Sequence, residues 1–282
     1  MTMTMTTAVP PAAAPDRYAV IGNPVAHSKS PLIHAAFARQ TGQSLSYEAL
    51  QAPLDGFRQT VRQFVASGGR GANVTVPFKL EAHGVATELS LRAAQAGAVN
   101  TLKFDGDVVY GDNTDGIGLV RDIERLGIGV GGRRVLLLGA GGAARGVLGP
   151  LLGQRPARVS VAARRLPKAA ELARLFDAPI GVYGIDDLPP GAFDIIINAT
   201  SASLSGASLA LPEGVFDQAQ LTYDMMYGRE LTAFLAMAQA SGSAQVADGL
   251  GMLVEQAAES FEIWRGVLPR TAEVLSMVRA AL

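Results

Sequence analysis

The chain of 282 residues contains no cysteine and only three histidines. The lack of thiols excludes disulfide bonds, thiolate catalysis and zinc sites built from cysteine. No two of the histidines, His27, His34 and His83, have a spacing that is typical of metal ligands. We therefore predict no metal site and expect all three histidines to be structural or surface residues.

An excess of charge of either sign is also missing, as is any long apolar run. The formal net charge is −1, which gives no sign of a surface for nucleic acid or for a membrane. No segment approaches the ~20 uninterrupted apolar residues of a transmembrane helix. Residues 1–16 are rich in Met, Thr, Ala and Pro and lack the basic start and long apolar core of a secretory signal. We expect a disordered leader at residues 1–16 and a cytoplasmic protein.

The chain is long for a single hydrophobic core, and its length predicts two domains. In the first half, apolar strands alternate with helical segments, which predicts parallel βαβ units. A helix is expected to open at Ser30-Pro31, with serine as a cap and proline at the first helical position. The other elements expected in this half are strands at 18–21, 47–50 and 71–76, helices at 57–66 and 79–96, and a hairpin around Asp105-Gly106.

The alternation restarts at Val135 and predicts a second α/β unit that extends to about Val246. Its expected strands are residues 135–138, 159–163, 193–198 and 221–225. A last helix is expected at residues 252–264, beyond this unit. This helix needs a surface to pack on, and the first domain can provide one.

The most informative segment is the glycine-rich turn that follows the strand at 135–138. It consists of Gly139, Ala140, Gly141, Gly142 and Ala143. Gly139 permits a tight turn, Gly141 lets backbone N–H groups approach a pyrophosphate, and Ala144 allows the next helix to pack closely. The N-terminus of that helix adds unpaired donors and a partial positive charge. A tight turn without a ligand could use the same residues, but the strand before it and the helix after it favour a dinucleotide site.

The end of the second strand of this unit indicates which dinucleotide binds. An NAD site usually has Asp or Glu about 20 residues after the glycines, whereas this strand ends in Arg164 and Arg165, with Lys168 shortly beyond. A carboxylate would repel a 2′-phosphate, and a guanidinium can bind one with two hydrogen bonds. A solvated helix start would explain the same charges, but we favour NADP over NAD.

Four polar segments of the first half fall where loops are expected, at residues 28–31, 73–79, 98–101 and 111–116. Loops after strand ends are where open α/β sheets bind ligands. Their hydroxyls and amides, with one ammonium and one carboxylate, suit a small polyhydroxylated substrate. Each segment alone also has an ordinary explanation, as a helix cap, a turn or a solvated lysine.

Taken together and in this order, the segments resemble the shikimate dehydrogenase family, from Tyr18 to the C-terminus. The residues that carry the resemblance are 22–24 (GNP), 28–34 (SKSPLIH), 71–79 (GANVTVPFK), 97–101 (GAVNT), 111–116 (GDNTDG), 139–143 (GAGGA), 197–200 (INAT), 223–225 (YDM) and 247–257 (ADGLGMLVEQA).

The resemblance implies NADPH-dependent, reversible reduction of 3-dehydroshikimate to shikimate, a step of aromatic amino-acid biosynthesis. It also implies roles for individual residues. Lys79 and Asp115 would be the catalytic pair, Ser28 and Ser30 would bind the substrate carboxylate, and Thr75, Asn100, Tyr227 and Gln256 would hold the carboxylate and hydroxyls. Met225 and Gly249 would lie near the nicotinamide, and Asn198, Ala199, Thr200 and Ser201 would line the cofactor cleft.

The implied pair of Lys79 and Asp115 is chemically reasonable. Hydride arrival at a ketone builds negative charge on its oxygen, and a nearby ammonium both stabilises that charge and supplies a proton. A neighbouring carboxylate favours the charged form of the lysine. Which group holds the proton at each step cannot be read from the sequence.

We therefore predict two α/β domains with the active site in the cleft between them, and closure of that cleft around the substrate. The expected segments are a substrate-binding catalytic domain (17–115), a Rossmann-type NADP-binding domain (116–248) and C-terminal helices that return to the first domain (249–282). A monomer and a homodimer are both compatible with the sequence. Two other functions stay open: a quinate/shikimate dehydrogenase that uses NAD or both cofactors, and a dinucleotide-sensing protein without catalysis.

Overall fold

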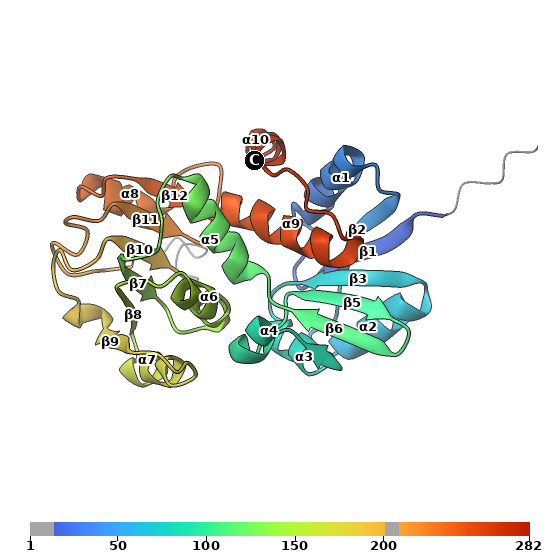
Figure 1. Ribbon diagram of the computed structural model, residues 1–282, viewed down its shortest axis with the longest axis horizontal. Coiled ribbons are helices and arrows are strands. Elements are labelled where there is room, and N and C mark those ends of the chain that lie inside the picture. The colour runs from blue at the N-terminus through green and yellow to red at the C-terminus, as the bar shows by residue number, and fades with distance from the viewer. Residues whose placement is uncertain (1–13, 201–208) are drawn as a thin grey trace, which may run out of the picture.

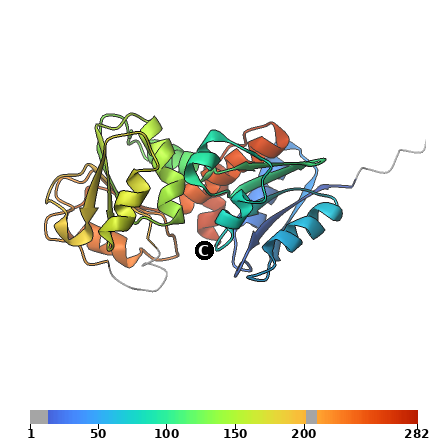
Figure 2. The same cartoon turned by 90° about the horizontal axis from the view of Figure 1, so that it is seen from below.

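The computed structural model describes residues 14–200 and 209–282. Within them the chain forms two six-stranded sheets, each covered by helices and placed side by side (Figures 1 and 2). This is the predicted arrangement of two α/β domains. The leader expected at residues 1–16 lies mostly outside the described residues, and its boundary is wrong because Asp16 already belongs to the first strand.

The first sheet has the strand order β2-β1-β3-β5-β6-β4. Strands β1, β2 and β3 are parallel, whereas β5 pairs antiparallel with both β3 and β6. The sheet is therefore mixed, because the β5–β6 hairpin interrupts the expected βαβ alternation. The elements are β1 (Asp16–Gly22), α1 (Ser30–Thr41), β2 (Leu45–Gln51), α2 (Phe57–Ala66), β3 (Gly69–Val74), α3 (Lys79–His83), β4 (Glu88–Leu89), α4 (Leu91–Ala96), β5 (Thr101–Asp105) and β6 (Val108–Asp112).

The single helix predicted at residues 79–96 is wrong. Helix α3 ends at His83, with Gly84 as its C-cap, and Glu88 and Leu89 then form the short strand β4, which pairs with β6. A new helix, α4, then starts with Ser90 as its cap, and the Ser90 hydroxyl accepts a hydrogen bond from the Ala93 N–H. The strand predicted at 71–76 also ends earlier, at Val74, so Thr75 lies in the turn before Pro77.

The second sheet is entirely parallel, with the order β12-β11-β10-β7-β8-β9. Read from the other edge, this is the strand order of a Rossmann dinucleotide-binding sheet, with its switch point between β7 and β10. Its elements are β7 (Arg134–Leu138), α6 (Gly142–Gly153), β8 (Arg158–Ala163), α7 (Leu166–Ala173), β9 (Ile180–Gly184), the 3-10 helix η1 (Ile185–Asp187), β10 (Ile195–Asn198), β11 (Leu221–Asp224), α8 (Ala233–Ala240) and β12 (Val246–Asp248).

Strands β7, β8, β10 and β11 lie where the apolar runs predict them, to within one or two residues. Most of their residues are fully buried, as expected for strands covered by helices on both faces. Strands β9 and β12 were not predicted. Every residue of both is only partly buried, so neither produces a continuous apolar run.

Two long helices run between the domains: α5 (Asp115–Arg125) and α9 (Leu250–Arg265) (Figure 1). They pack closely on each other, and a Cβ on Gly118 of α5 would lie 2.7 Å from the backbone nitrogen of Gln256. Helix α9 also shares an apolar cluster with α1 and with the last helix, α10 (Ala272–Ala280), through Ile33, Phe37 and Val274. No helix in residues 14–200 and 209–282 is long and apolar enough to cross a membrane.

Candidate active site

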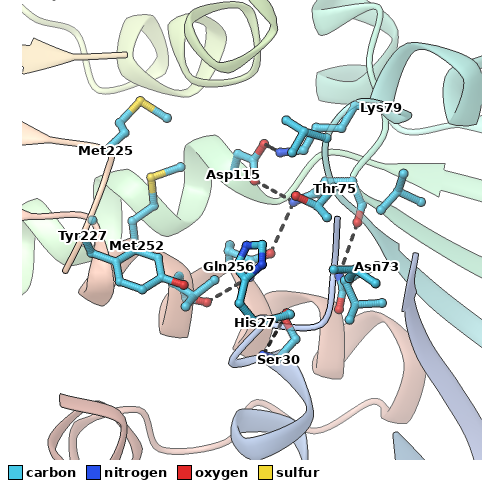
Figure 3. A pocket seen from close by; sticks show the side chains of 18 of the residues that line it. His27, Ser30, Asn73, Thr75, Lys79, Asp115, Met225, Tyr227, Met252 and Gln256 are labelled. Atoms are coloured by element: carbon cyan, nitrogen blue, oxygen red, sulfur yellow. Dashed lines mark hydrogen bonds and ion pairs between the residues drawn. The ribbon is translucent and has the colours of Figure 1, made fainter. Parts of the chain in front are cut away.

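A cavity of about 210 Å³ lies between the two domains. All eight residues that the resemblance assigns to catalysis or substrate binding line it, together with Met225 and Gly249. Lys79 and Asp115 face each other on one side, and Met225, Met252 and Tyr227 lie on the other (Figure 3). The ten residues come from widely separated parts of the sequence: Ser28, Ser30, Thr75, Lys79, Asn100, Asp115, Met225, Tyr227, Gly249 and Gln256.

Lys79 and Asp115 form a direct ion pair. The Lys79 Nζ lies 2.5 Å from Asp115 Oδ2, and the two side chains are 25% and 10% exposed. Lys79 begins α3 after the turn that follows β3, and Asp115 begins α5 after β6. The other carboxylate oxygen of Asp115 accepts a hydrogen bond from Asn100 Nδ2 at 2.8 Å. The carboxylate is thus held from both sides, and the ammonium still reaches the cavity.

The segment from residue 28 to residue 30 forms the entrance to α1. Ser28 Oγ accepts a hydrogen bond from the backbone N–H of Ser30 at 3.2 Å, and Ser30 is buried. The expected capping role of Ser30 is wrong: Lys29 occupies the cap position without a side-chain hydrogen bond, and Ser30 is the first helical residue. The Ser28 hydroxyl thus accepts from the first N–H of α1, and both serines line the cavity.

Asn100 and Gln256 belong to a cluster of buried, hydrogen-bonded polar side chains in the wall of the cavity. Asn100 Nδ2 lies 2.9 Å from Thr114 Oγ1 and 3.3 Å from Gln256 Oε1, and Gln256 Nε2 donates to the Leu253 carbonyl. Tyr227 enters from the other domain, and burial together with the nearby Asp248 carboxylate raises the pKa of its phenol. Its hydroxyl therefore stays protonated and can donate a hydrogen bond at neutral pH.

Asn73 also lines the cavity, but the sequence analysis gave this residue no role of its own. It points from β3 into the domain interior, and its Nδ2 donates to Thr101 Oγ1 at 3.1 Å and to Ser260 Oγ at 2.9 Å. Its Oδ1 accepts from Tyr47 OH at 2.8 Å and lies 3.2 Å from His34 Nε2. An amide between the apolar residues Ala72 and Val74 near the end of a strand was the available signal, since a buried amide requires several partners.

The histidines have different environments, as only the structure can reveal. His34 is fully buried and stacked on Tyr47, with ring centroids 4.3 Å apart. Burial lowers the pKa of His34 to about 3, so its ring is neutral. His83 ends α3 and is half-buried, whereas His27 is exposed and lines the cavity (Figure 3). The interpretation of His27 as an ordinary surface residue thus missed its place in the cavity wall.

The glycine-rich turn lies at the switch point of the second sheet. Gly139 has a φ of +108°, and a Cβ there would lie 3.2 Å from the Ala199 backbone, so glycine is required. Gly141 and Gly142 face open space instead. Helix α6 starts at Gly142 with no side-chain cap on its N–H groups, and Ala144 is fully buried behind it. Open space beside uncapped N–H groups fits the pyrophosphate of a dinucleotide.

The basic residues after β8 are all exposed at the carboxyl end of the sheet. Arg164 and Arg165 follow the last strand residue directly, and neither forms an ion pair within the described part of the chain. Lys168 is paired with Glu171 at 2.6 Å. No carboxylate occupies this strand end, so the side chains present fit a 2′-phosphate better than a free ribose hydroxyl.

Asn198 and Thr200 lie at the end of β10, beside the glycine-rich turn. Asn198 is fully buried, and its Nδ2 donates to Asp224 Oδ1 at 3.1 Å while its Oδ1 accepts from the Thr200 N–H and hydroxyl. Met225 and Gly249 lie close together, since a Cβ on Gly249 would collide with the Met225 carbonyl. Ser201 lies outside the described residues.

Comparisons with known proteins agree with this architecture. A model described as the shikimate dehydrogenase substrate binding domain matches residues 20–102. A shikimate / quinate 5-dehydrogenase model matches residues 124–208, and a shikimate 5'-dehydrogenase C-terminal domain model matches residues 249–276.

Relatives match over nearly the whole chain. The shikimate dehydrogenase (NADP(+)) of Dechloromonas aromatica is 60% identical over 270 residues, which are 95% of this chain and 98% of that protein. The crystal structure of an Ael1 enzyme from Pseudomonas putida is 48% identical, with a TM-score of 0.90 over 93% of this chain and 97% of the other. The Thermus thermophilus shikimate 5-dehydrogenase in complex with NADP(H) and shikimate is 33% identical, with a TM-score of 0.84 over 95% and 100% of the two chains.

A two-domain α/β fold with a cleft between a mixed sheet and a Rossmann sheet defines a class of dinucleotide-dependent oxidoreductases. Within that class, the chain belongs to the shikimate dehydrogenase family.

Proposed function

We propose that this chain catalyses the reversible, NADPH-dependent reduction of 3-dehydroshikimate to shikimate, as a step of aromatic amino-acid biosynthesis. The observation that carries the proposal is the Lys79–Asp115 ion pair, which lies in a cavity that also contains Met225 and Gly249. The relatives named NADP-dependent shikimate dehydrogenase, at 60% identity over most of the chain, support the same reaction.

When bound, NADPH would supply the hydride, and the residues of this chain stabilise the developing charge and donate the proton. Lys79 is the group we assign to the ketone oxygen, because an ammonium there stabilises the developing negative charge and donates a proton. Asp115 keeps that ammonium in place through their 2.5 Å contact. Asn100 in turn holds the second oxygen of Asp115.

We assign substrate binding to the other polar groups of the cavity. Ser28 and Ser30 bind the carboxylate of the substrate, because their hydroxyls lie at the entrance of α1. The remaining four residues hold the carboxylate and the ring hydroxyls: Thr75, Asn100, Tyr227 and Gln256.

We assign the NADP site to the carboxyl edge of the second sheet. The turn at residues 139–143 binds the pyrophosphate through backbone N–H groups. Arg164 and Arg165 bind the 2′-phosphate, with Lys168 adding positive charge, because a guanidinium matches a phosphate with two parallel hydrogen bonds. Asn198 and Thr200 line this cleft, and Met225 and Gly249 border the nicotinamide.

The domain boundaries at residues 115 and 248, closure of the cleft and location in the cytoplasm remain our proposals. The same holds for the oligomeric state, monomer or homodimer.

The rate of nicotinamide reduction by the purified protein tests the proposed function. Shikimate and quinate are each offered with NADP+ and with NAD+. We expect turnover of shikimate with NADP+ and little in the other three mixtures. Comparable rates with quinate or NAD+ would instead indicate a catabolic quinate/shikimate dehydrogenase. Binding of NADP+ without turnover of either substrate would indicate a dinucleotide-sensing protein.

A further inference from the structure

Arg279, near the end of α10, reaches across to the second domain. Its Nη1 lies 2.6 Å from Asp248 Oδ2, and its Nη2 lies 2.5 Å from Asp248 Oδ1. The guanidinium and the carboxylate therefore form a bidentate pair. Nη1 also donates to the Gly228 carbonyl at 3.3 Å. The Asp248 side chain is only 11% exposed, whereas that of Arg279 is 47% exposed.

The two groups that Arg279 holds belong to the segments that form one wall of the substrate cavity. Asp248 directly precedes Gly249, and its Oδ1 also accepts a hydrogen bond from the Leu250 N–H at the start of α9. Gly228 directly follows Tyr227. The two segments already touch, because the Gly249 N–H donates to the Met226 carbonyl at 3.1 Å.

Arg279 acts from outside the cavity. With Gly228 and Asp248 it lines a separate groove of about 460 Å³, and this groove shares no lining residue with the substrate cavity. Arg279 therefore touches neither the substrate site nor the cofactor site directly. It can influence the reaction only through the position of the segments at residues 225–228 and 248–249.

We propose that Arg279 is a positioning residue for the reaction, because its guanidinium fixes the wall that carries Met225, Tyr227 and Gly249 against the nicotinamide and substrate. This inference rests on the proposed function. A bidentate pair sets both the distance and the direction of the carboxylate. Lysine has a single ammonium and can restore the charge but not the direction.

Loss of the guanidinium frees the wall to shift relative to Lys79 on the opposite side of the cavity. Since a misplacement of about 1 Å can cost up to about a hundredfold in rate, we expect Arg279→Ala to lower kcat by between tenfold and a hundredfold. The proposed site for the adenosine end of NADP+ is on other elements, so KM for NADP+ should change by less than about threefold.

The experiment compares four variants with the unaltered enzyme. They are Arg279→Ala, Arg279→Lys, Asp248→Asn and the double variant that combines Arg279→Ala with Asp248→Asn. Arg270→Ala is the matched control, since this arginine also lies in the C-terminal segment. Its side chain is 78% exposed and, among the described residues, forms an ion pair only with Glu273, at 4.0 Å. Each protein is assayed for kcat, for KM of shikimate and NADP+, and for Tm. The primary deuterium isotope effect with shikimate labelled at the oxidised carbon shows whether hydride transfer itself is slowed.

We expect Arg279→Ala to lower kcat and raise the isotope effect, Arg279→Lys to recover part of the rate, and Arg270→Ala to match the unaltered enzyme. The double variant should be only slightly slower than Asp248→Asn, since Asp248 accepts two of the three hydrogen bonds of the guanidinium and the third, to the Gly228 carbonyl, is long. An Arg279→Ala enzyme with unchanged kcat and isotope effect would overturn the assignment, as would a fall in Tm with no change in kinetics. If the unaltered enzyme does not oxidise shikimate, the proposed function fails and the role of Arg279 fails with it.

Discussion

Replacement of Lys79 by alanine is the most direct test of the proposed chemistry. The change removes an ammonium that lies 2.5 Å from Asp115 Oδ2 and reaches the cavity. The Asp115 carboxylate keeps its 2.8 Å hydrogen bond from Asn100, and the backbone N–H of Asp115 still donates to Asn113 Oδ1. The remaining site should therefore keep its shape and lose only the proton donor.

The size of the effect follows from the role of the lost group. General acid–base catalysis by one side chain is worth about 10²–10⁴ in rate, so kcat should fall at least a hundredfold, which is about 3 kcal/mol of transition-state stabilisation. KM for shikimate should change much less, because the serines and amides that we assign to substrate binding remain in place.

The assay is steady-state oxidation of shikimate by NADP+, with Lys103→Ala as the matched control. Lys103 belongs to the same domain as Lys79, on β5 of the first sheet, but does not line the cavity. A second variant, Asp115→Asn, and the double variant test the pair as a unit, since residues that act together give strongly non-additive losses. A Lys79→Ala enzyme that retains near-normal kcat would refute the assignment of Lys79 as proton donor.

Three further outcomes follow from the structure. The Arg164→Ala, Arg165→Ala double variant should raise KM for NADPH much more than KM for NADH, because only NADPH carries the 2′-phosphate; equal effects would mean that these arginines do not read it. Tyr223→Phe removes the 2.6 Å hydrogen bond from the buried phenol to Asp122. It should lower the free energy of unfolding, measured in urea, by about 1.5–3 kcal/mol. A decrease of less than about 0.5 kcal/mol would contradict this reasoning. Burial lowers the pKa of His34 to about 3. Between pH 6.5 and 3 the unfolded chain therefore binds one more proton than the folded chain. The free energy of unfolding should fall by about 1.4 kcal/mol for each pH unit as the pH is lowered through that window. Urea titrations at pH 6.5 and 5 should therefore show a steeper loss in the unaltered protein than in His34→Gln, and parallel slopes would contradict the assignment.

The second domain was the more predictable part of the fold. The runs at 135–138 and 159–163 are uninterrupted, because parallel strands covered on both faces must be apolar throughout. The tight turn predicted at Gly139 is confirmed, since this glycine has a φ of +108° and lies next to the Ala199 backbone. Strand β12 escaped prediction because its three residues are all partly exposed.

The first domain was less predictable, because its sheet is mixed. Residues 79–96 are helical in composition, yet two residues of this stretch, Glu88 and Leu89, pair with β6. That pairing depends on the position of a hairpin about 20 residues further along the chain, which no local pattern encodes. Tertiary contacts therefore override the helical propensity of this stretch.

The candidate site was predictable as a set of residues but not as a connected structure. A family resemblance identifies Asn100 and Gln256 one by one, whereas the hydrogen bonds that join them to Thr114 and Ser260 depend on three-dimensional packing. Ser260 is fully buried and lies 2.8 Å from Thr101 Oγ1. Nothing in its sequence neighbourhood distinguishes it from an ordinary helical serine.

The buried polar network also bears on how the cleft can close. Asp115 begins α5 and Gln256 lies on α9, and both side chains bond to Asn100, which directly precedes β5. Breaking these bonds in a dry interior would leave unpaired polar groups, at about 1–3 kcal/mol for each. The wall with Lys79, Asn100, Asp115 and Gln256 should therefore move as one body. We expect closure to consist of the other wall, with Met225, approaching it. This second wall is the one that the proposed Arg279–Asp248 pair positions.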